Sequence, residues 1–137
     1  MSYRVGVIGC TGIGTQHASS LVGLTDAELV AGCDLSSSVL ERFQEHWAEE
    51  WPDMATYTDH RQMLAEARLD IVTVATSDHK HADLVVDAAQ AGVKGIFCEK
   101  PMATSIADAD RMLSATDANG TILSIAHTRR WQPLWVE

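Results

Sequence analysis

Residues 9–14 read Gly9-Cys10-Thr11-Gly12-Ile13-Gly14, and this stretch decides the fold. It follows a β-branched apolar run over residues 3–8 and opens a helical pattern over residues 14–24. A glycine turn between a strand and a helix is typical of dinucleotide-binding domains, because its backbone amides and the helix dipole hold a diphosphate. The turn alone also occurs in flavin, methyl-donor and short-chain dehydrogenase folds. We therefore expect Gly9, Thr11, Gly12, Ile13 and Gly14 to bind a dinucleotide cofactor. The usual G-x-G-x-x-G pattern has its middle glycine at position 11, and the sequence leaves open whether Thr11 crowds the diphosphate or binds it through its hydroxyl.

The alternation of strand and helix patterns continues along the chain. Short apolar runs over residues 28–33, 54–57, 70–75, 95–98 and 122–126 predict five further strands. Helices are predicted at residues 14–24, from Ser36 or Ser37 to Pro52, from Thr58 or Asp59 through Leu64, at residues 81–91 ahead of Gly92, and at residues 105–118, where Ser105 and Asp108 resemble a capping box. The sequence therefore predicts an α/β fold, a doubly wound Rossmann sheet of about six strands in the order 3-2-1-4-5-6 with helices on both faces.

The composition narrows the function classes. The chain has 137 residues, enough for one domain core, and its net charge of -9 argues against electrostatic binding to nucleic acid or anionic lipid. No apolar run approaches the roughly 20 residues that span a bilayer, and the first residues lead into a strand without a secretory signal. We expect a cytoplasmic protein with a small-molecule substrate and no nucleic-acid or membrane partner. Cys10, Cys33 and Cys98 have no metal-type spacing and are interpreted as buried thiols.

Asp34 ends the second predicted strand, about 20 residues beyond Gly14. At this place a carboxylate accepts hydrogen bonds from both hydroxyls of the adenosine ribose and repels a 2′-phosphate. No arginine stands in the next three positions, which read Leu35-Ser36-Ser37. The sequence therefore favours NAD over NADP, with a helix cap or a plain loop aspartate as the alternative for Asp34.

Three further motifs stand at predicted strand ends. They are residues 75–81 (Ala-Thr-Ser-Asp-His-Lys-His), residues 98–101 (Cys-Glu-Lys-Pro) and residues 127–133 (His-Thr-Arg-Arg-Trp-Gln-Pro). Together with the opening turn through Ala18, they resemble the Gfo/Idh/MocA family, named after glucose-fructose oxidoreductase and inositol dehydrogenase, over essentially the whole chain. Ser77 replaces a proline that is common in the family's loop.

The resemblance implies roles for the residues in these motifs. Lys100 is the expected catalytic residue, which contacts substrate hydroxyls and the nicotinamide ribose and favours a developing alkoxide during hydride removal. Glu99 is expected to orient Lys100 or the cofactor, with a solvated loop pair as the alternative for Glu99 and Lys100. His81 is expected to cap the next helix and approach the cofactor or substrate. The cofactor contacts implied in this half of the chain are Ala75, Thr76, His81, Glu99 and Lys100.

The remaining candidates concern substrate and metal. Arg129 and Arg130 are candidate substrate contacts beside Lys100, with contact to a second domain or plain surface charge as alternatives. We expect no metal site, because His79 and His81 stand two residues apart at a helix start and do not share a face.

The resemblance also implies a domain plan and a function. Residues 1–127 would form the dinucleotide-binding domain, and residues 128–137 would begin a connection to a substrate domain that this sequence lacks. The parent protein would be an NAD-dependent oxidoreductase, a homo-oligomer at full length, that transfers a hydride between the cofactor and a secondary alcohol of a sugar, cyclitol or related polyol. This chain alone would be inactive. The alternatives are a stand-alone dinucleotide-binding or sensor module without catalysis, and a similar enzyme that uses bound NAD for hydrolysis or elimination.

Overall fold

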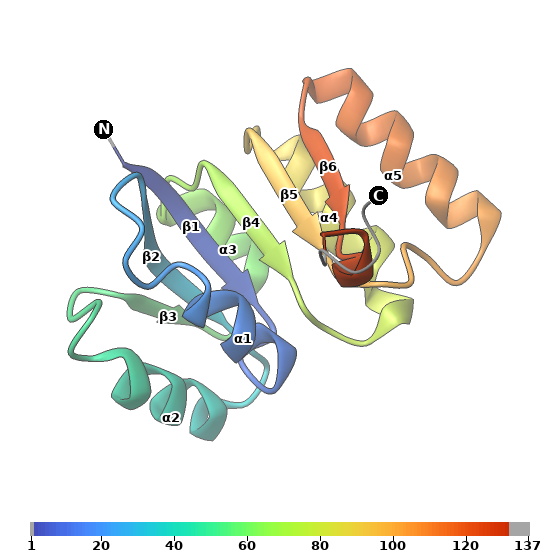
Figure 1. Cartoon of the computed structure of the whole chain (residues 1–137). Helices are drawn as coiled ribbons and strands as arrows, with labels where there is room; N and C mark the ends of the chain where they lie inside the picture. Colours follow the sequence, from blue (N-terminus) through green and yellow to red (C-terminus); the bar gives the residue numbers. More distant parts are fainter. Residues whose placement is uncertain (1, 132–137) are drawn as a thin grey trace.

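Six parallel strands form one sheet in the structure, a computed structural model that describes residues 2–131 (Figure 1). The strand order is the predicted one, β3-β2-β1-β4-β5-β6. The neighbouring strands pair in parallel throughout. The strands are β1 (Tyr3–Ile8), β2 (Ala27–Cys33), β3 (Ala55–Tyr57), β4 (Ile71–Val74), β5 (Gly95–Cys98) and β6 (Ile122–Ile125).

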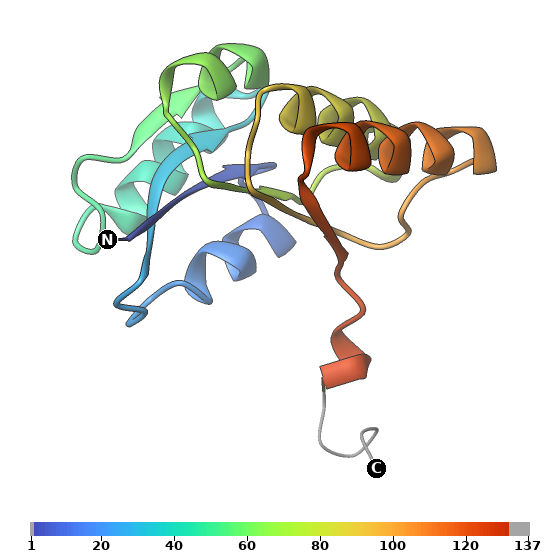
Figure 2. The ribbon, with the colours of Figure 1, turned by 90° about the horizontal axis from the view of Figure 1, so that it is seen from above.

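Helices cover both faces of the sheet, as predicted. They are α1 (Ile13–Ser19), α2 (Ser37–Trp47), α3 (His60–Glu66), α4 (His81–Gln90) and α5 (Ile106–Asn119), with a short 3-10 turn η1 (Asp78–Lys80) before α4. The first two helices contribute to one hydrophobic core cluster and the last three to the other. Figure 2 shows α1 on the opposite side of the sheet from α4 and α5. This sandwich is the Rossmann arrangement that the alternating pattern predicts.

The central strands are buried on both faces, which explains their continuous apolar runs. Val5 and Val7 of β1, and Val72 and Val74 of β4, are at most 1% exposed. Because these two strands lie in the middle of the sheet, their carboxyl ends are held by core packing on both sides. The loops that follow β1 and β4 therefore start from a rigid base.

Two predicted helix caps are present. Asp59, one of the two candidates for the start of α3, accepts a hydrogen bond from the Arg61 amide at 2.8 Å. Ser105 accepts one from the Asp108 amide at 3.1 Å at the start of α5. Such caps satisfy amides that the first helical turn leaves unpaired.

The first helix is shorter than predicted. The pattern over residues 14–24 extends the helix to Leu24, but α1 ends at Ser19. The next amides bond in turns of three residues, from Leu21 to the Ala18 carbonyl and from Val22 to the Ser19 carbonyl. Val22 and Leu24 are 42% and 50% exposed, so the apolar side chains that suggested more helix find no core to pack against.

The second helix ends before the proline that was predicted to stop it. It ends at Trp47, and the Trp51 amide then bonds to the Trp47 carbonyl at 2.8 Å in a turn that precedes Pro52. The rings of Trp47 and Trp51 pack with their centroids 5.2 Å apart, and Trp47 and Met54 are both buried in the same core cluster. The turn thus brings the chain back to the sheet for β3.

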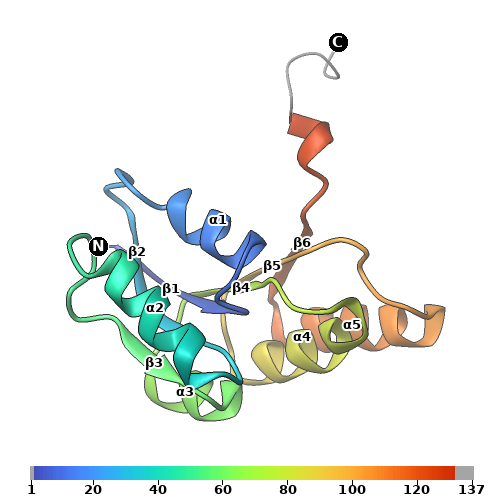
Figure 3. The same ribbon diagram turned by 90° about the horizontal axis from the view of Figure 1, so that it is seen from below.

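After β6 the chain leaves the sheet on the face that carries α1 and forms the 3-10 turn η2 (Thr128–Trp131) (Figure 3). Of the predicted connection over residues 128–137, residues 132–137 lie outside the described residues. Within residues 2–131, no helix has the length and the apolar character needed to cross a bilayer.

Candidate functional site

The turn after β1 depends on two close backbone approaches. Gly9 has a φ of +92°, and a Cβ built on it would overlap the Ala75 carbonyl at the end of β4. A Cβ on Gly14 would overlap the carbonyl oxygen of Gly9. Side chains at these positions would push α1 away from the end of β1. The two glycines therefore bring the start of α1 against the edge of the sheet.

Three backbone amides of this turn have no partner among residues 2–131. Within residues 2–131 the amides of Thr11, Gly12 and Ile13 donate no hydrogen bond, whereas the Gly14 amide donates to the Thr11 carbonyl at 2.8 Å. Unpaired amides at the start of a helix carry a partial positive charge and suit an anion. A Cβ on Gly12 would have open space around it, which leaves room for a ligand close to the backbone. The turn therefore has the donors that a diphosphate needs.

The Thr11 side chain is exposed and lies beside a hollow of about 310 Å³ between the turn and α2. Arg42 and His46 of α2 also line this hollow. The open question about Thr11 is thus answered in part, since its side chain is not packed inside the turn. Its hydroxyl is accessible to a ligand held by the neighbouring amides.

Asp34 lies against the same turn. Its Oδ2 accepts a hydrogen bond from the Cys10 amide at 3.1 Å, and its Oδ1 accepts one from the Ser36 amide at 3.0 Å. A carboxylate has about four lone-pair sites, so two remain free to accept further hydrogen bonds. Asp34 is not the cap of α2, since Ser36 is its N-cap residue, and the bonds to Cys10 and Ser36 hold the carboxylate in the loop. The contact of Asp34 with the adenosine ribose stays a prediction.

The three cysteines are buried and unpaired with one another. Burial raises the pKa of the Cys10 thiol from 9.0 to about 12, and the charge of Asp34 adds to this effect. Burial likewise raises the pKa values of Cys33 and Cys98 to about 12. Neutral, buried thiols are poor nucleophiles, so the interpretation as core residues is confirmed.

The ends of β4 and β5 carry the second group of predicted residues. The Ala75 amide bonds to the Ile8 carbonyl at 2.8 Å, and the Glu99 amide bonds to the Val74 carbonyl at 2.9 Å. These bonds place Ala75, Glu99 and the glycine turn side by side at the carboxyl edge of the sheet, where ligands of open α/β sheets bind. Thr76 follows Ala75 in the same loop and is half-buried, and Lys100 follows Glu99 and is exposed.

Glu99 connects this edge to α1. Its Oε1 lies 3.1 Å from Nε2 of His17, and its Oε2 accepts a hydrogen bond from the Lys100 amide at 3.3 Å. The side chains of His17 and Glu99 are only 10% and 14% exposed. Glu99 is thus a largely buried carboxylate held between the helix after the glycine turn and the backbone of Lys100, and not a solvated loop residue.

His81 does not cap α4, contrary to the prediction. It is the first residue of the helix, and its ring turns inward with 1% of the residue exposed. Its Nδ1 lies 2.8 Å from the Pro101 carbonyl oxygen and its Nε2 lies 3.2 Å from the Thr76 carbonyl oxygen. The ring therefore ties the loop after β4 to the segment after β5. A direct contact with cofactor or substrate stays a prediction, and the burial of the ring favours an indirect role.

The remaining candidates lie in the two 3-10 turns that follow β4 and β6. Arg129 and Arg130 are exposed in η2, on the segment that projects from the sheet on the α1 side (Figure 3). Lys80 and His79 are exposed in η1. Among residues 2–131 no cluster of histidine, cysteine or carboxylate side chains has the arrangement of a metal site.

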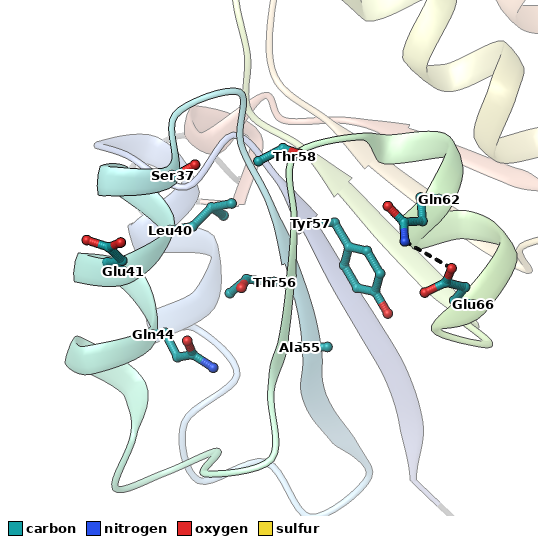
Figure 4. Close-up of a pocket in the computed structure, with 10 residues that line it drawn as sticks. All are labelled: Ser37, Leu40, Glu41, Gln44, Ala55, Thr56, Tyr57, Thr58, Gln62 and Glu66. Atoms are coloured by element: carbon teal, nitrogen blue, oxygen red, sulfur yellow. Dashed lines mark hydrogen bonds between the residues drawn. The ribbon is translucent and has the colours of Figure 1, made fainter.

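A larger hollow, of about 520 Å³, lies over the edge strand β3 between α2 and α3 (Figure 4). Glu41 and Glu66 stand on its two sides, and Gln62 donates a hydrogen bond to Glu66 at 3.0 Å. None of the predicted site residues lines it. Its two carboxylates make it a poor place for a diphosphate, so the hollow is not the predicted site.

Sequence reasoning missed His17 as a member of the site. The signal was present in the helical spacing, since Gly14 and Ala18 are buried against the sheet and His17 lies next to Ala18 on the inner side. A histidine on the inner face of a helix needs a polar partner. Its partner, Glu99, is 82 residues away in sequence, so the pair appears only in the folded chain.

Comparison with known proteins identifies the family. The sequence model of an oxidoreductase family with an NAD-binding Rossmann fold, Gfo/Idh/MocA, matches residues 3–127. The chain is 36% identical to myo-inositol 2-dehydrogenase of Thermotoga maritima over 93% of its own length and 37% of that protein. It is also 36% identical to D-apiose dehydrogenase of Paraburkholderia graminis, over 96% of its own length and 34% of that protein.

A solved structure resembles the fold closely. The WlbA dehydrogenase of Bordetella pertussis, crystallised in complex with NADH and UDP-GlcNAcA, superposes with a TM-score of 0.90 and 28% sequence identity. The match covers 98% of this chain and 40% of that chain. The chain thus spans between a third and two fifths of the length of these relatives.

Proposed function

The chain belongs to the Gfo/Idh/MocA oxidoreductase family and forms its NAD-binding Rossmann domain, and from this premise we propose that the protein oxidises a secondary alcohol of a sugar, cyclitol or related polyol. NAD, when bound, supplies the hydride acceptor. The names of two relatives give a cyclitol, myo-inositol, and a sugar, D-apiose, as their substrates. The proposal extends this chemistry to the present protein without choosing one substrate.

The observation that supports cofactor binding most strongly is the set of unpaired amides beside Asp34. The amides of Thr11, Gly12 and Ile13 donate to no acceptor within residues 2–131. We propose that they hold the diphosphate, with Gly9 and Gly14 providing the close approach of the backbone. Asp34, with two lone-pair sites free, accepts the hydroxyls of the adenosine ribose and disfavours NADP.

The nicotinamide half would lie along the ends of β4 and β5. In this proposal Ala75 and Thr76 contact the cofactor through the loop after β4, and Glu99 and Lys100 contact it after β5. Lys100 is exposed, so its ammonium group is free to approach the reacting hydroxyl. A cation at this place stabilises the negative charge that develops on the oxygen as the hydride leaves the carbon. The His81 ring contacts the backbone of both segments, at the Thr76 and Pro101 carbonyls.

The proposed domain organisation, location and oligomeric state follow the family resemblance. Residues 1–127 would form the dinucleotide-binding domain, and residues 128–137 would begin the connection to a substrate domain, with Arg129 and Arg130 facing substrate or that domain. The unpaired, buried cysteines agree with a cytoplasmic location, where thiols stay reduced. A homo-oligomer is proposed on the usual assembly of the family.

Calorimetry tests cofactor binding by the chain itself. Titration with NAD should give one binding event per chain, and a folded chain that releases no heat with millimolar NAD would refute the proposal.

The proposed reaction is tested on the whole protein with myo-inositol and D-apiose, by the absorbance of the reduced nicotinamide. Lys100→Met should lower turnover by about 100-fold or more while NAD still binds, because one preorganised charge is worth about that much. Lys80→Met, at an exposed lysine in η1, is the matched control. Equal turnover in both variants would contradict the role of Lys100.

A further inference from the structure

The pair formed by His17 and Glu99 links the two halves of the site. His17 lies on α1, three positions after the last glycine of the turn, and Glu99 lies at the end of β5. Their 3.1 Å contact joins residues 82 apart in sequence. The pair is therefore a direct bridge between the element that follows the diphosphate turn and the segment that carries Lys100.

The surroundings of the pair fix its geometry. The His17 ring packs on the ring of Phe97, with centroids 5.1 Å apart and planes inclined by 55°. This contact holds the plane of the ring, and Nε2 faces the Glu99 carboxylate. Nδ1 of His17 is buried and has no hydrogen-bond partner within residues 2–131. The polar connection of the ring thus runs through Nε2 alone.

The carboxylate passes this constraint on to Lys100. One oxygen of Glu99 takes the hydrogen bond from His17, and the other accepts from the Lys100 amide at 3.3 Å. Without His17, a carboxylate that is only 14% exposed would lose its side-chain donor. A buried acceptor without a donor is costly, so Glu99 would turn toward water and release the Lys100 amide.

We propose that His17 is a positioning residue, whose Nε2–H holds Glu99 so that Glu99 fixes the backbone of Lys100 at the nicotinamide end of the cleft. This role rests on the proposed function, because it assumes that Lys100 meets the nicotinamide ribose. It assigns His17 no contact with the cofactor or with the substrate. It makes the orientation of α1 one of the factors that set the position of Lys100.

The test compares His17→Leu with His17→Gln. Leucine fills space against Phe97 but donates nothing, whereas the side-chain amide of glutamine donates from about the place of Nε2. Gln16→Leu, at an exposed neighbour on α1, is the matched control for changes in the helix itself. The affinities of all variants for NAD and for ADP are measured by calorimetry. ADP contains only the adenosine and diphosphate part of the cofactor.

His17→Leu should weaken NAD binding by about ten-fold and ADP binding by less than about two-fold, and His17→Gln should return NAD binding to within about three-fold of the original chain. An unchanged NAD affinity in His17→Leu, or an equal loss for NAD and ADP, would overturn the proposal. If the original chain failed to bind NAD at all, the proposed function itself would be at fault. The two failures are therefore distinguishable.

A second measurement needs no ligand. In nitrogen–proton correlation spectra, the amide resonance of Lys100 should shift in His17→Leu, because its acceptor moves, and should stay in place in His17→Gln and Gln16→Leu. A Lys100 resonance that is unmoved in a folded His17→Leu chain would overturn the proposal. If His17→Leu does not fold, the same spectra and titrations on His17→Asn decide the question, because the shorter amide keeps a polar group but cannot reach the carboxylate.

Discussion

Replacing Asp34 with alanine should weaken the preference of the domain for NAD over NADP. The carboxylate keeps about two lone-pair sites after its bonds to the Cys10 and Ser36 amides, and each would accept one ribose hydroxyl. A hydrogen bond to a charged group contributes about 1.5–3 kcal/mol, and the lower value suits a half-buried acceptor. The loss of two such bonds is about 3 kcal/mol, so NAD should bind roughly 100-fold more weakly.

NADP should respond in the opposite direction. Its 2′-phosphate carries a charge near -2, and at about 5 Å from a carboxylate in water the repulsion is about 1.7 kcal/mol. The removal of this repulsion alone should therefore strengthen NADP binding by at least about ten-fold, against which the loss of ribose contacts acts. The ratio of NAD affinity to NADP affinity should therefore fall by about one to about three orders of magnitude. The smaller fall applies if NADP loses the same ribose contacts as NAD, and the larger fall applies if it loses none.

The assay is calorimetric titration of Asp34→Ala, Asp34→Asn and Asp110→Ala with both cofactors. Asp34→Asn keeps the shape and one acceptor oxygen but loses the charge, so its ratio should lie between those of the other two. Asp110, exposed on α5, is the matched control, and its loss should change neither affinity. Equal binding of NAD and NADP by the original chain, or the same ratio in all three variants, would refute the reasoning.

Three further predictions concern stability. Because burial raises the pKa of the three cysteine thiols from 9.0 to about 12, iodoacetamide should label them only on unfolding, and labelling of the native chain at the rate of a free cysteine would count against this. The free energy of unfolding should also fall as pH rises above 9.0, because unfolded thiols then lose protons that folded thiols keep. Ser105→Ala should lower the free energy of unfolding in urea by about 1 kcal/mol, whereas Thr104→Ala, one residue before the cap, should change it little. The hydrogen bond from the Arg4 amide, and then the bond from Lys94, lower the pKa of Asp70 below 3.8. Asp70→Asn should therefore lower the free energy of unfolding by about 1 kcal/mol at neutral pH and by progressively less as the pH falls below 3.8. A loss of stability that is independent of pH would contradict the assignment.

The local features of this chain follow from neighbouring residues. The strand runs, the cap at Ser105 and the glycine turn all depend on residues within a few positions of one another, so the sequence predicts them. The parallel order 3-2-1-4-5-6 also follows, since right-handed crossovers leave few other arrangements for alternating strands and helices. The end of α1 does not follow, because Val22 and Leu24 look helical until the fold leaves them exposed. The end of α2 does not follow either, because the chain turns at Trp47 and Trp51 before it reaches Pro52.

The amino-acid sequence by itself determined the sheet, the diphosphate turn and the identity of the residues at the strand ends, because these depend on short-range patterns of side-chain size and backbone freedom. The tertiary structure decided which of those residues meet. It turned His81 inward between the Thr76 and Pro101 carbonyls, placed Asp34 against the Cys10 amide and brought His17 to Glu99. The physical reason is that a contact between residues 82 positions apart depends on how the strands are ordered and how the helices pack, and no local pattern records that geometry.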